Sequence, residues 1–408
     1  MSKFDHYFLM STDDVVDYTL EKVTLFDWDR ATMKSKEIGD GNLNYVFRVW
    51  DEKGNSVIIK HAGESLRISK DMHISTDRNR IESEILILEE KLAHGLVPKI
   101  YFYDTVMSAC AMQDLTGHEL MRYALMNHET FPKFAEDVTT FLANALLGTT
   151  DVCLEHKEKK NLQRKFINPE LCEITEDLVY TEPYNDCKGR NNVFTPNLDF
   201  VKKELYEDDE LKLEVAKLKF EFMTNSQALL HGDLHTGSIF VKPDSTYVFD
   251  PEFAFYGPIG YDSGNVVANL IFAWCNGDAT ITDKTEKDKF CGWLEKTVVE
   301  VVDLFMSKMS SYYDAHCTER MAMVPGFKEW YLGTILADTS ACTGLEMNRR
   351  TVGMANVKDL TAINDVEKRI RAERLCILAG KRFIKERTSL KNGTAFIKVF
   401  KDAVDAYK

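Results

Sequence analysis

The three carboxylates of Asp233, Asp250 and Glu252 lie within twenty residues, separated by two short β-forming runs. The runs cover residues 238–241 and 246–249, and a connection that short predicts a tight hairpin. Because a hairpin returns both of its ends to one place, we expect the three side chains at one edge of a sheet. Such a group could orient an attacking hydroxyl and hold a metal-bound nucleotide, as phosphoryl transfer requires.

Near the N-terminus, Gly39 and Gly41 predict a tight turn that follows a short first strand. A turn of this kind lets backbone amides approach phosphate oxygens. The strands predicted after it cover residues 45–50 and 56–60, and the second one ends at Lys60. A lysine at that place could bind the phosphates of a nucleotide.

A helix is predicted over residues 77–94, followed by Gly95 as its stop. Its apolar residues recur at helical spacing: Ile81, Ile85, Leu88 and Leu92. This spacing places Glu84 toward the sheet and Glu82 toward solvent. We therefore expect Glu84 to pair with Lys60 and to hold the lysine at a nucleotide phosphate.

Two more predicted strands, at 101–104 and 109–113, complete a five-stranded small lobe, and the rest of the chain is mainly helical. We expect residues 1–115 to form a nucleotide-binding lobe that ends in a hinge. Residues 116–408 should form the larger lobe, with the catalytic loop and the substrate site. Its predicted helices cover residues 131–148, 169–179, 201–231, 262–275, 286–313, 327–345 and 363–388.

The composition is that of a soluble globular protein of 408 residues with a formal net charge of −14. This charge argues against non-specific binding to nucleic acid or to an anionic membrane. No stretch approaches the roughly 18 apolar residues of a membrane span, and residues 1–15 lack the apolar region of a secretory signal. The nine cysteines show no C-x-x-C spacing, which favours reduced thiols in the cytoplasm.

The order of these motifs resembles the protein-kinase-like fold, in the form found in aminoglycoside phosphotransferases and choline kinases. The likeness is closer to the 5-methylthioribose kinase family. It rests on five blocks of this sequence: residues 39–44, 231–241, 250–253, 256–262 and 346–353. The implied fold class is α+β, with two lobes: a small N-terminal lobe with an antiparallel five-stranded sheet and one helix, and a larger, mainly helical C-terminal lobe. Two residues depart from the protein-kinase pattern: Ser238 replaces a metal-binding Asn, and Asn44 replaces a third loop glycine.

The resemblance implies transfer of the ATP γ-phosphate to the anomeric hydroxyl of 5-methylthioribose, in methionine salvage, by a homodimer. Asp233 would orient the hydroxyl and accept its proton, and Asp250 and Glu252 would hold Mg²⁺. Arg349 and Arg350 would bind the sugar and the transferring phosphate. The expected nucleotide site consists of Gly39, Gly41, Asn44, Lys60, Glu84 and the hinge residues Gln113, Asp114 and Leu115.

Three other functions remain open from the residues alone. His231, Asp233 and His235 alternate and could bind zinc or manganese in a metal-dependent hydrolase. The same fold could also serve as a binding module without activity, or phosphorylate another alcohol such as choline or an aminoglycoside. The adjacent arginines 349 and 350 favour a neutral polyol over such cationic acceptors.

Overall fold

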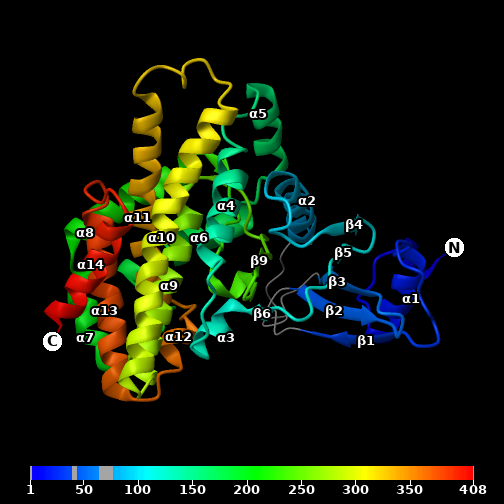
Figure 1. Cartoon of the computed structure of the whole chain (residues 1–408), viewed down its shortest axis with the longest axis horizontal. Coiled ribbons are helices and arrows are strands. Elements are labelled where there is room, and N and C mark those ends of the chain that lie inside the picture. The colour runs from blue at the N-terminus through cyan, green and yellow to red at the C-terminus, as the bar shows by residue number, and fades with distance from the viewer. Residues whose placement is uncertain (1, 39–43, 64–76, 408) are drawn as a thin grey trace. The chain divides into compact units, whose positions relative to one another are not determined.

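The computed structural model describes residues 2–38, 44–63 and 77–407 (Figure 1). The chain folds as two compact units. The first unit contains residues 1–118 and 249–254, and the second contains residues 119–248 and 255–408. Asp250 and Glu252 therefore belong to the first unit, whereas Asp233 and the hairpin that precedes Asp250 belong to the second.

The first unit is built on a five-stranded antiparallel sheet, as the sequence predicted. The strands lie in the order β1 (Lys34–Glu37), β2 (Asn44–Trp50), β3 (Ser56–Ala62), β5 (Ala109–Met112) and β4 (Ile100–Asp104). β3 is the central strand and reads as a nearly continuous buried run, which is typical of a strand covered on both faces. It carries Lys60, paired in register with Cys110 of β5.

Two helices pack on this sheet, so the prediction of a single helix was wrong. α2 (Asp77–Leu92) packs on β3, β4 and β5, and the unpredicted α1 (Thr12–Lys22) packs on β1 and β2. Ser11 and Asp14 cap α1 reciprocally: the Ser11 hydroxyl accepts from the Asp14 N–H, and the Asp14 carboxylate accepts from the Ser11 N–H. This signal was present in the sequence, but only four residues of α1 are buried, so the apolar stripe is short.

The second unit is mainly helical and contains two small antiparallel sheets, β6–β8–β9 and β7–β10. Its strands are β6 (Glu119–Leu120), β7 (Ala228–Leu229), β8 (Ile239–Lys242), β9 (Ser245–Val248) and β10 (Tyr256–Gly257). Lys242 pairs with Ser245, which confirms the predicted hairpin. Its α-helices are α3 (Met121–Met126), α4 (Phe134–Leu147), α5 (His156–Lys165), α6 (Pro169–Leu178), α7 (Leu198–Val201), α8 (Asp209–Thr224), α9 (Gly260–Thr280), α10 (Lys284–His316), α11 (Phe327–Val352), α12 (Lys358–Thr361), α13 (Val366–Lys385) and α14 (Gly393–Ala406). Among the described residues, no helix is long and apolar enough to cross a membrane.

Three of these helices, α9, α11 and α13, pack closely because glycines stand where they approach one another. A Cβ on Gly264 of α9 would lie 2.7 Å from the Thr343 N of α11, and a Cβ on Gly344 would lie 2.3 Å from the Gly380 O of α13. Ser263 and Thr339 also share a hydrogen bond of 2.7 Å between α9 and α11. The close fit fixes the C-terminal half of α11, which carries both predicted sugar-binding arginines.

Candidate active site

In the first unit, Lys60 is surrounded by carboxylates. Its Nζ lies 2.6 Å from Glu82 Oε2 and also donates to Asp250 Oδ1. The Lys60 side chain is 9% exposed and that of Glu82 only 2%, so this charge pairing takes place out of water. Burial opposes the charge on Lys60, but Asp250, Glu82 and Glu252 together raise its pKa, so it stays protonated.

The partner of Lys60 on α2 is Glu82, and the prediction of Glu84 was wrong. Glu84 Oε2 lies 2.5 Å from Arg80 Nη1, and the Glu84 side chain is 27% exposed, so it lies on the side of the helix nearer to solvent. The predicted stripe assumed that only apolar residues face the sheet, but α2 also buries polar side chains. One of these is Asn79, whose Nδ2 donates to Lys60 O at 3.0 Å and Ser108 O at 2.9 Å. These contacts turn the face of α2 that carries Asn79 and Glu82 toward the sheet. Position 82 therefore lies over β3, where position 84 was predicted to lie.

Asp250 and Glu252 lie in the short segment 249–254 that returns to the first unit. Asp250 has a φ of 69°, a left-handed backbone that Asp adopts more readily than most residues. The buried Glu252 carboxylate accepts a 3.3 Å hydrogen bond from Asn44 Nδ2. Burial and the neighbouring Asp250 charge raise the pKa of Glu252. Three carboxylates share one lysine here, and two of them, Asp250 and Glu252, offer hard oxygen donors of the kind that Mg²⁺ prefers.

The other predicted nucleotide-binding residues are two glycines and the hinge residues Gln113, Asp114 and Leu115. Gly39 and Gly41 lie outside the described residues. The Asp114 carboxylate accepts from Arg48 Nε at 2.6 Å and from Thr116, so its side chain holds the segment after β5. Gln113 N–H donates to Lys99 O, and Leu115 O accepts from His118 N–H. Within the described part of the chain, Gln113 O and Leu115 N–H have no hydrogen-bond partner.

In the second unit, the loop that carries Asp233 is held by a residue that we did not predict as functional, Asp262. This buried carboxylate, in the first turn of α9, accepts from His231 N–H at 2.7 Å and Gly232 N–H at 3.0 Å. Gly232 has a φ of 85°, which favours glycine at this turn. The Ser238 hydroxyl donates to Asp233 O at 3.1 Å. Ser238 therefore acts on the loop backbone in this structure.

Three side chains converge on the Asp233 carboxylate. Arg349 Nη2 donates to Oδ1 at 2.9 Å, and Arg350 Nη2 donates to the same oxygen at 3.1 Å. His235 Nε2 lies 3.3 Å from Oδ2, and its Nδ1 accepts from Gly237 N–H. Since a neutral imidazole that accepts at one nitrogen donates at the other, Nε2 faces Asp233 as a donor. Burial alone would raise the pKa of Asp233, but His235, Arg350 and Arg349 hold it well below its ordinary value.

Both ring nitrogens of His235 are engaged in this way, by Gly237 N–H and by the Asp233 carboxylate. Among the described residues, no group of three His, Cys, Asp or Glu side chains could hold a metal ion.

The predicted pair Arg349 and Arg350 is brought onto Asp233 by α11. The arginines are in turn held by Glu346, a buried residue of the block 346–353 that was not among the predicted site residues. A carboxylate three and four residues before two arginines was the available signal.

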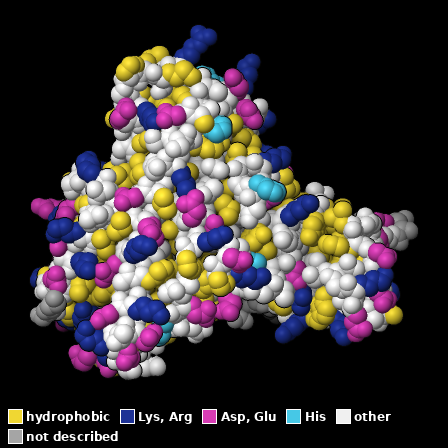
Figure 2. Space-filling model, in the orientation of Figure 1, with side chains coloured by type: hydrophobic (Ala, Val, Ile, Leu, Met, Phe, Trp, Pro, Cys, Tyr) yellow, Lys and Arg dark blue, Asp and Glu magenta, His cyan; other side chains and the backbone are white. Residues whose placement is uncertain are grey.

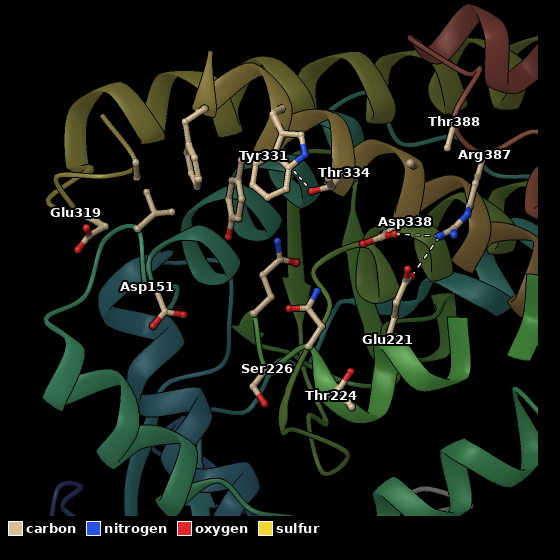
Figure 3. A pocket seen from close by; sticks show the side chains of 17 residues that line it. Asp151, Glu221, Thr224, Ser226, Glu319, Tyr331, Thr334, Asp338, Arg387 and Thr388 are labelled. Carbon is tan, nitrogen blue, oxygen red and sulfur yellow. Dashed lines mark hydrogen bonds and ion pairs between the residues drawn. The ribbon is translucent and has the colours of Figure 1, made fainter. Parts of the chain in front are cut away.

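A hollow of about 610 Å³ lies elsewhere in the second unit, beside the N-terminal half of α11 (Figure 3). Trp330 and Tyr331 line it, and Arg387 Nη1 donates to Glu221 at 3.2 Å on its wall. None of the predicted site residues lines it. Exposed apolar side chains gather over the segment between α10 and α11 and the first turn of α11 (Figure 2): Met321, Met323, Val324 and Trp330.

The chain is similar to known phosphotransferases over most of its length. Residues 34–284 match the model of the phosphotransferase enzyme family. The methylthioribose kinase of Geobacillus thermodenitrificans (strain NG80-2) is 37% identical over 374 residues, 91% of this chain and 92% of that protein. The methylthioribose kinase of Escherichia coli O45:K1 (strain S88 / ExPEC) is 37% identical over 372 residues, 88% of each chain.

A solved choline kinase from Cryptosporidium parvum Iowa II covers 97% of both chains with a TM-score of 0.51 and 12% identity. That likeness shows the fold alone, the protein-kinase-like fold that the sequence predicted. The identity to the two bacterial enzymes extends over nearly the whole chain. This chain therefore belongs to the methylthioribose kinase family of phosphotransferase enzymes.

Proposed function

We propose that this enzyme transfers the γ-phosphoryl group of ATP to the anomeric hydroxyl of 5-methylthioribose, giving 5-methylthioribose 1-phosphate for methionine salvage. The kinase activity follows from the family, and the acceptor is inferred from the names of the relatives. The observation that carries the proposal is the joint hold of Arg349 and Arg350 on Asp233. This contact puts the Asp233 carboxylate, which would orient the attacking hydroxyl, beside two guanidinium groups, which would donate to the sugar and to the phosphoryl group being transferred.

The first unit would bind the nucleotide. Lys60 offers a buried, protonated ammonium to the phosphates, and Glu82 sets its position. Gln113 O and Leu115 N–H offer one acceptor and one donor to adenine, as expected of a hinge. Asp250 and Glu252 would hold Mg²⁺, which when bound neutralises charge on the phosphate oxygens.

The second unit would bind the acceptor. Phosphoryl transfer has a loose transition state in which the attacking hydroxyl keeps its proton until late, so orientation matters more than strong basicity. A carboxylate with a low pKa suits this task, and Asp233 has one. The acceptor hydroxyl would donate to Asp233, and the arginines would donate to the sugar and to the transferring group.

We also propose, from the family resemblance, that the enzyme acts in the cytoplasm as a homodimer. The proposed division of labour assigns nucleotide binding to residues 1–115 and acceptor binding to residues 116–408, with 249–254 contributing to the nucleotide site. No nucleic acid or membrane partner is proposed. Size-exclusion chromatography with light scattering tests the homodimer, and a monomeric mass would refute it.

A coupled assay of ADP release tests the acceptor. Purified enzyme with MgATP is offered 5-methylthioribose, ribose, choline and an aminoglycoside at equal concentrations. The expected result is turnover with 5-methylthioribose at least about a hundred-fold above the others, because a site that pairs buried polar groups rejects acceptors that leave them unpaired. Preference for choline or the aminoglycoside would refute the assignment and identify the alternative kinase.

A further inference from the structure

Glu346 completes a closed ring of four charged side chains in the second unit. Its Oε1 accepts from Arg350 Nε at 3.1 Å, and its Oε2 accepts from Arg349 Nε. Asp233 closes the ring from the other side through the Nη2 groups of both arginines. Each acid thus contacts both arginines, and each arginine contacts both acids.

The position of Glu346 on α11 makes this possible. Residues three and four positions later on a helix lie on the same face, so one carboxylate reaches both guanidinium groups. Glu346 is 1% exposed, and the arginines are 9% and 8% exposed. The buried carboxylate is needed for charge balance, because an unpaired guanidinium is costly away from water.

A second layer of contacts holds Glu346 itself. Asn269 of α9 donates from Nδ2 to Glu346 Oε1 at 3.3 Å. The amide oxygen of Asn269 accepts from Arg122 Nη2 and from the Thr236 hydroxyl, both at 3.2 Å. The carboxylate is therefore fixed from α9 as well as from its own helix.

Some N–H groups of the two arginines are not used by the ring. Glu346 uses the Nε of each arginine and Asp233 uses one Nη of each. Within the described residues, the Nη1 groups of Arg349 and Arg350 make no hydrogen bond. A guanidinium is rigid and planar, so fixing two of its nitrogens fixes the third.

We propose that Glu346 is a positioning residue for the acceptor: it fixes both arginine forks so that their remaining N–H groups form one preorganised donor set for the hydroxyls of a neutral sugar. This inference rests on the proposed function, since it assumes that the arginines bind the acceptor. In this role Glu346 acts on the acceptor through Arg349 and Arg350, the two arginines whose Nε groups it accepts from.

The test compares Glu346→Gln with a matched control, Glu373→Gln. Glu373 is likewise a buried helical glutamate that accepts from an arginine of its own helix, Arg369 Nε at 2.8 Å, and from an asparagine, Asn197 Nδ2 at 2.8 Å. Glutamine keeps the shape but turns an NH₂ group toward one arginine. We expect Glu346→Gln to raise the KM for 5-methylthioribose about ten- to a hundred-fold, the effect of one lost charged hydrogen bond. The KM for ATP should stay within about two-fold, a margin well inside 1 kcal/mol.

The control should lose thermal stability without a change in either KM, which separates positioning from a general loss of packing. Glu346→Asp, which keeps the charge and withdraws the carboxylate by one methylene, serves if the glutamine variant does not fold, and should also raise the sugar KM. A folded variant at position 346 with a wild-type sugar KM overturns the inference. Wild-type enzyme that does not use 5-methylthioribose at all would instead refute the proposed function.

Discussion

Two neighbouring glutamates of α2 provide the sharpest test of the nucleotide site. Glu82→Gln should impair the use of ATP strongly, and Glu84→Gln hardly at all. Glu82 lies 2.6 Å from Lys60 Nζ with its side chain 2% exposed, whereas Glu84 pairs with Arg80 and is 27% exposed. The two variants make the same chemical change two residues apart, so each is the control of the other.

The magnitude follows from the burial of the two pairs. A buried hydrogen bond to a charged group contributes about 1.5–3 kcal/mol, which corresponds to a roughly ten- to hundred-fold loss in kcat/KM for ATP. The loss should not exceed this range, because Lys60 keeps its contact with Asp250. A partly exposed pair at i,i+4 contributes only about 0.3–0.5 kcal/mol, so Glu84→Gln should change kcat/KM less than about three-fold.

The assay varies ATP at saturating 5-methylthioribose and follows ADP release. Thermal melts of both variants establish that each is folded at the assay temperature. A wild-type kcat/KM for ATP in folded Glu82→Gln would refute the assignment of Glu82. A larger effect at Glu84 would restore the sequence-based prediction and contradict the rotation of α2.

Further expected outcomes concern catalysis, pH and packing. Asp233→Asn should lower kcat by about 10²–10⁴ with little change in the KM for ATP, and steady-state kinetics would show it. Burial raises the pKa of Asp338 from its ordinary 3.8 to about 7, so this group favours folding below about pH 4 and disfavours it as the pH rises through 7. At pH 8, Asp338→Asn should therefore have a larger free energy of unfolding than the wild type, by at most about 4 kcal/mol. This difference in stability should disappear near pH 4, and thermal or chemical denaturation at the two pH values measures it. Gly344→Ala should lose roughly 1–3 kcal/mol in chemical denaturation, because its Cβ would overlap Gly380 O.

Elements with strong periodicity or turn chemistry could be predicted from the sequence. The five strands of the first unit follow from alternating β-forming runs and polar turns, and the β8–β9 hairpin from its short connection. The helix predicted over 201–231 was too long, since α8 ends at Thr224 and β7 follows. Its sequence stays apolar into a buried strand, and a short apolar run does not distinguish the two states.

The placement of candidate site residues was predictable where residue type and local position decide it, as for Lys60, Asp233 and the arginine pair. It was not predictable where a buried polar residue faces another element. Glu82 and Asp262 are buried because they satisfy groups far away in the chain, on β3 and in the loop before Asp233. A periodicity rule that counts only apolar residues misplaces such side chains, since their burial depends on partners and not on hydropathy.

The charge balance around α11 bears on the choice of acceptor. Glu346 and Asp233 together carry two negative charges, and Arg349 and Arg350 carry two positive ones, so the buried ring is neutral without substrate. A cationic acceptor would add positive charge beside two guanidinium groups with no carboxylate left over in the ring to pair with it. A neutral sugar adds none, and a phosphoryl group that arrives on it brings negative charge that the arginines can stabilise. Given the proposed role of Arg349 and Arg350 in binding the acceptor, the ring favours a neutral polyol over choline or an aminoglycoside on electrostatic grounds.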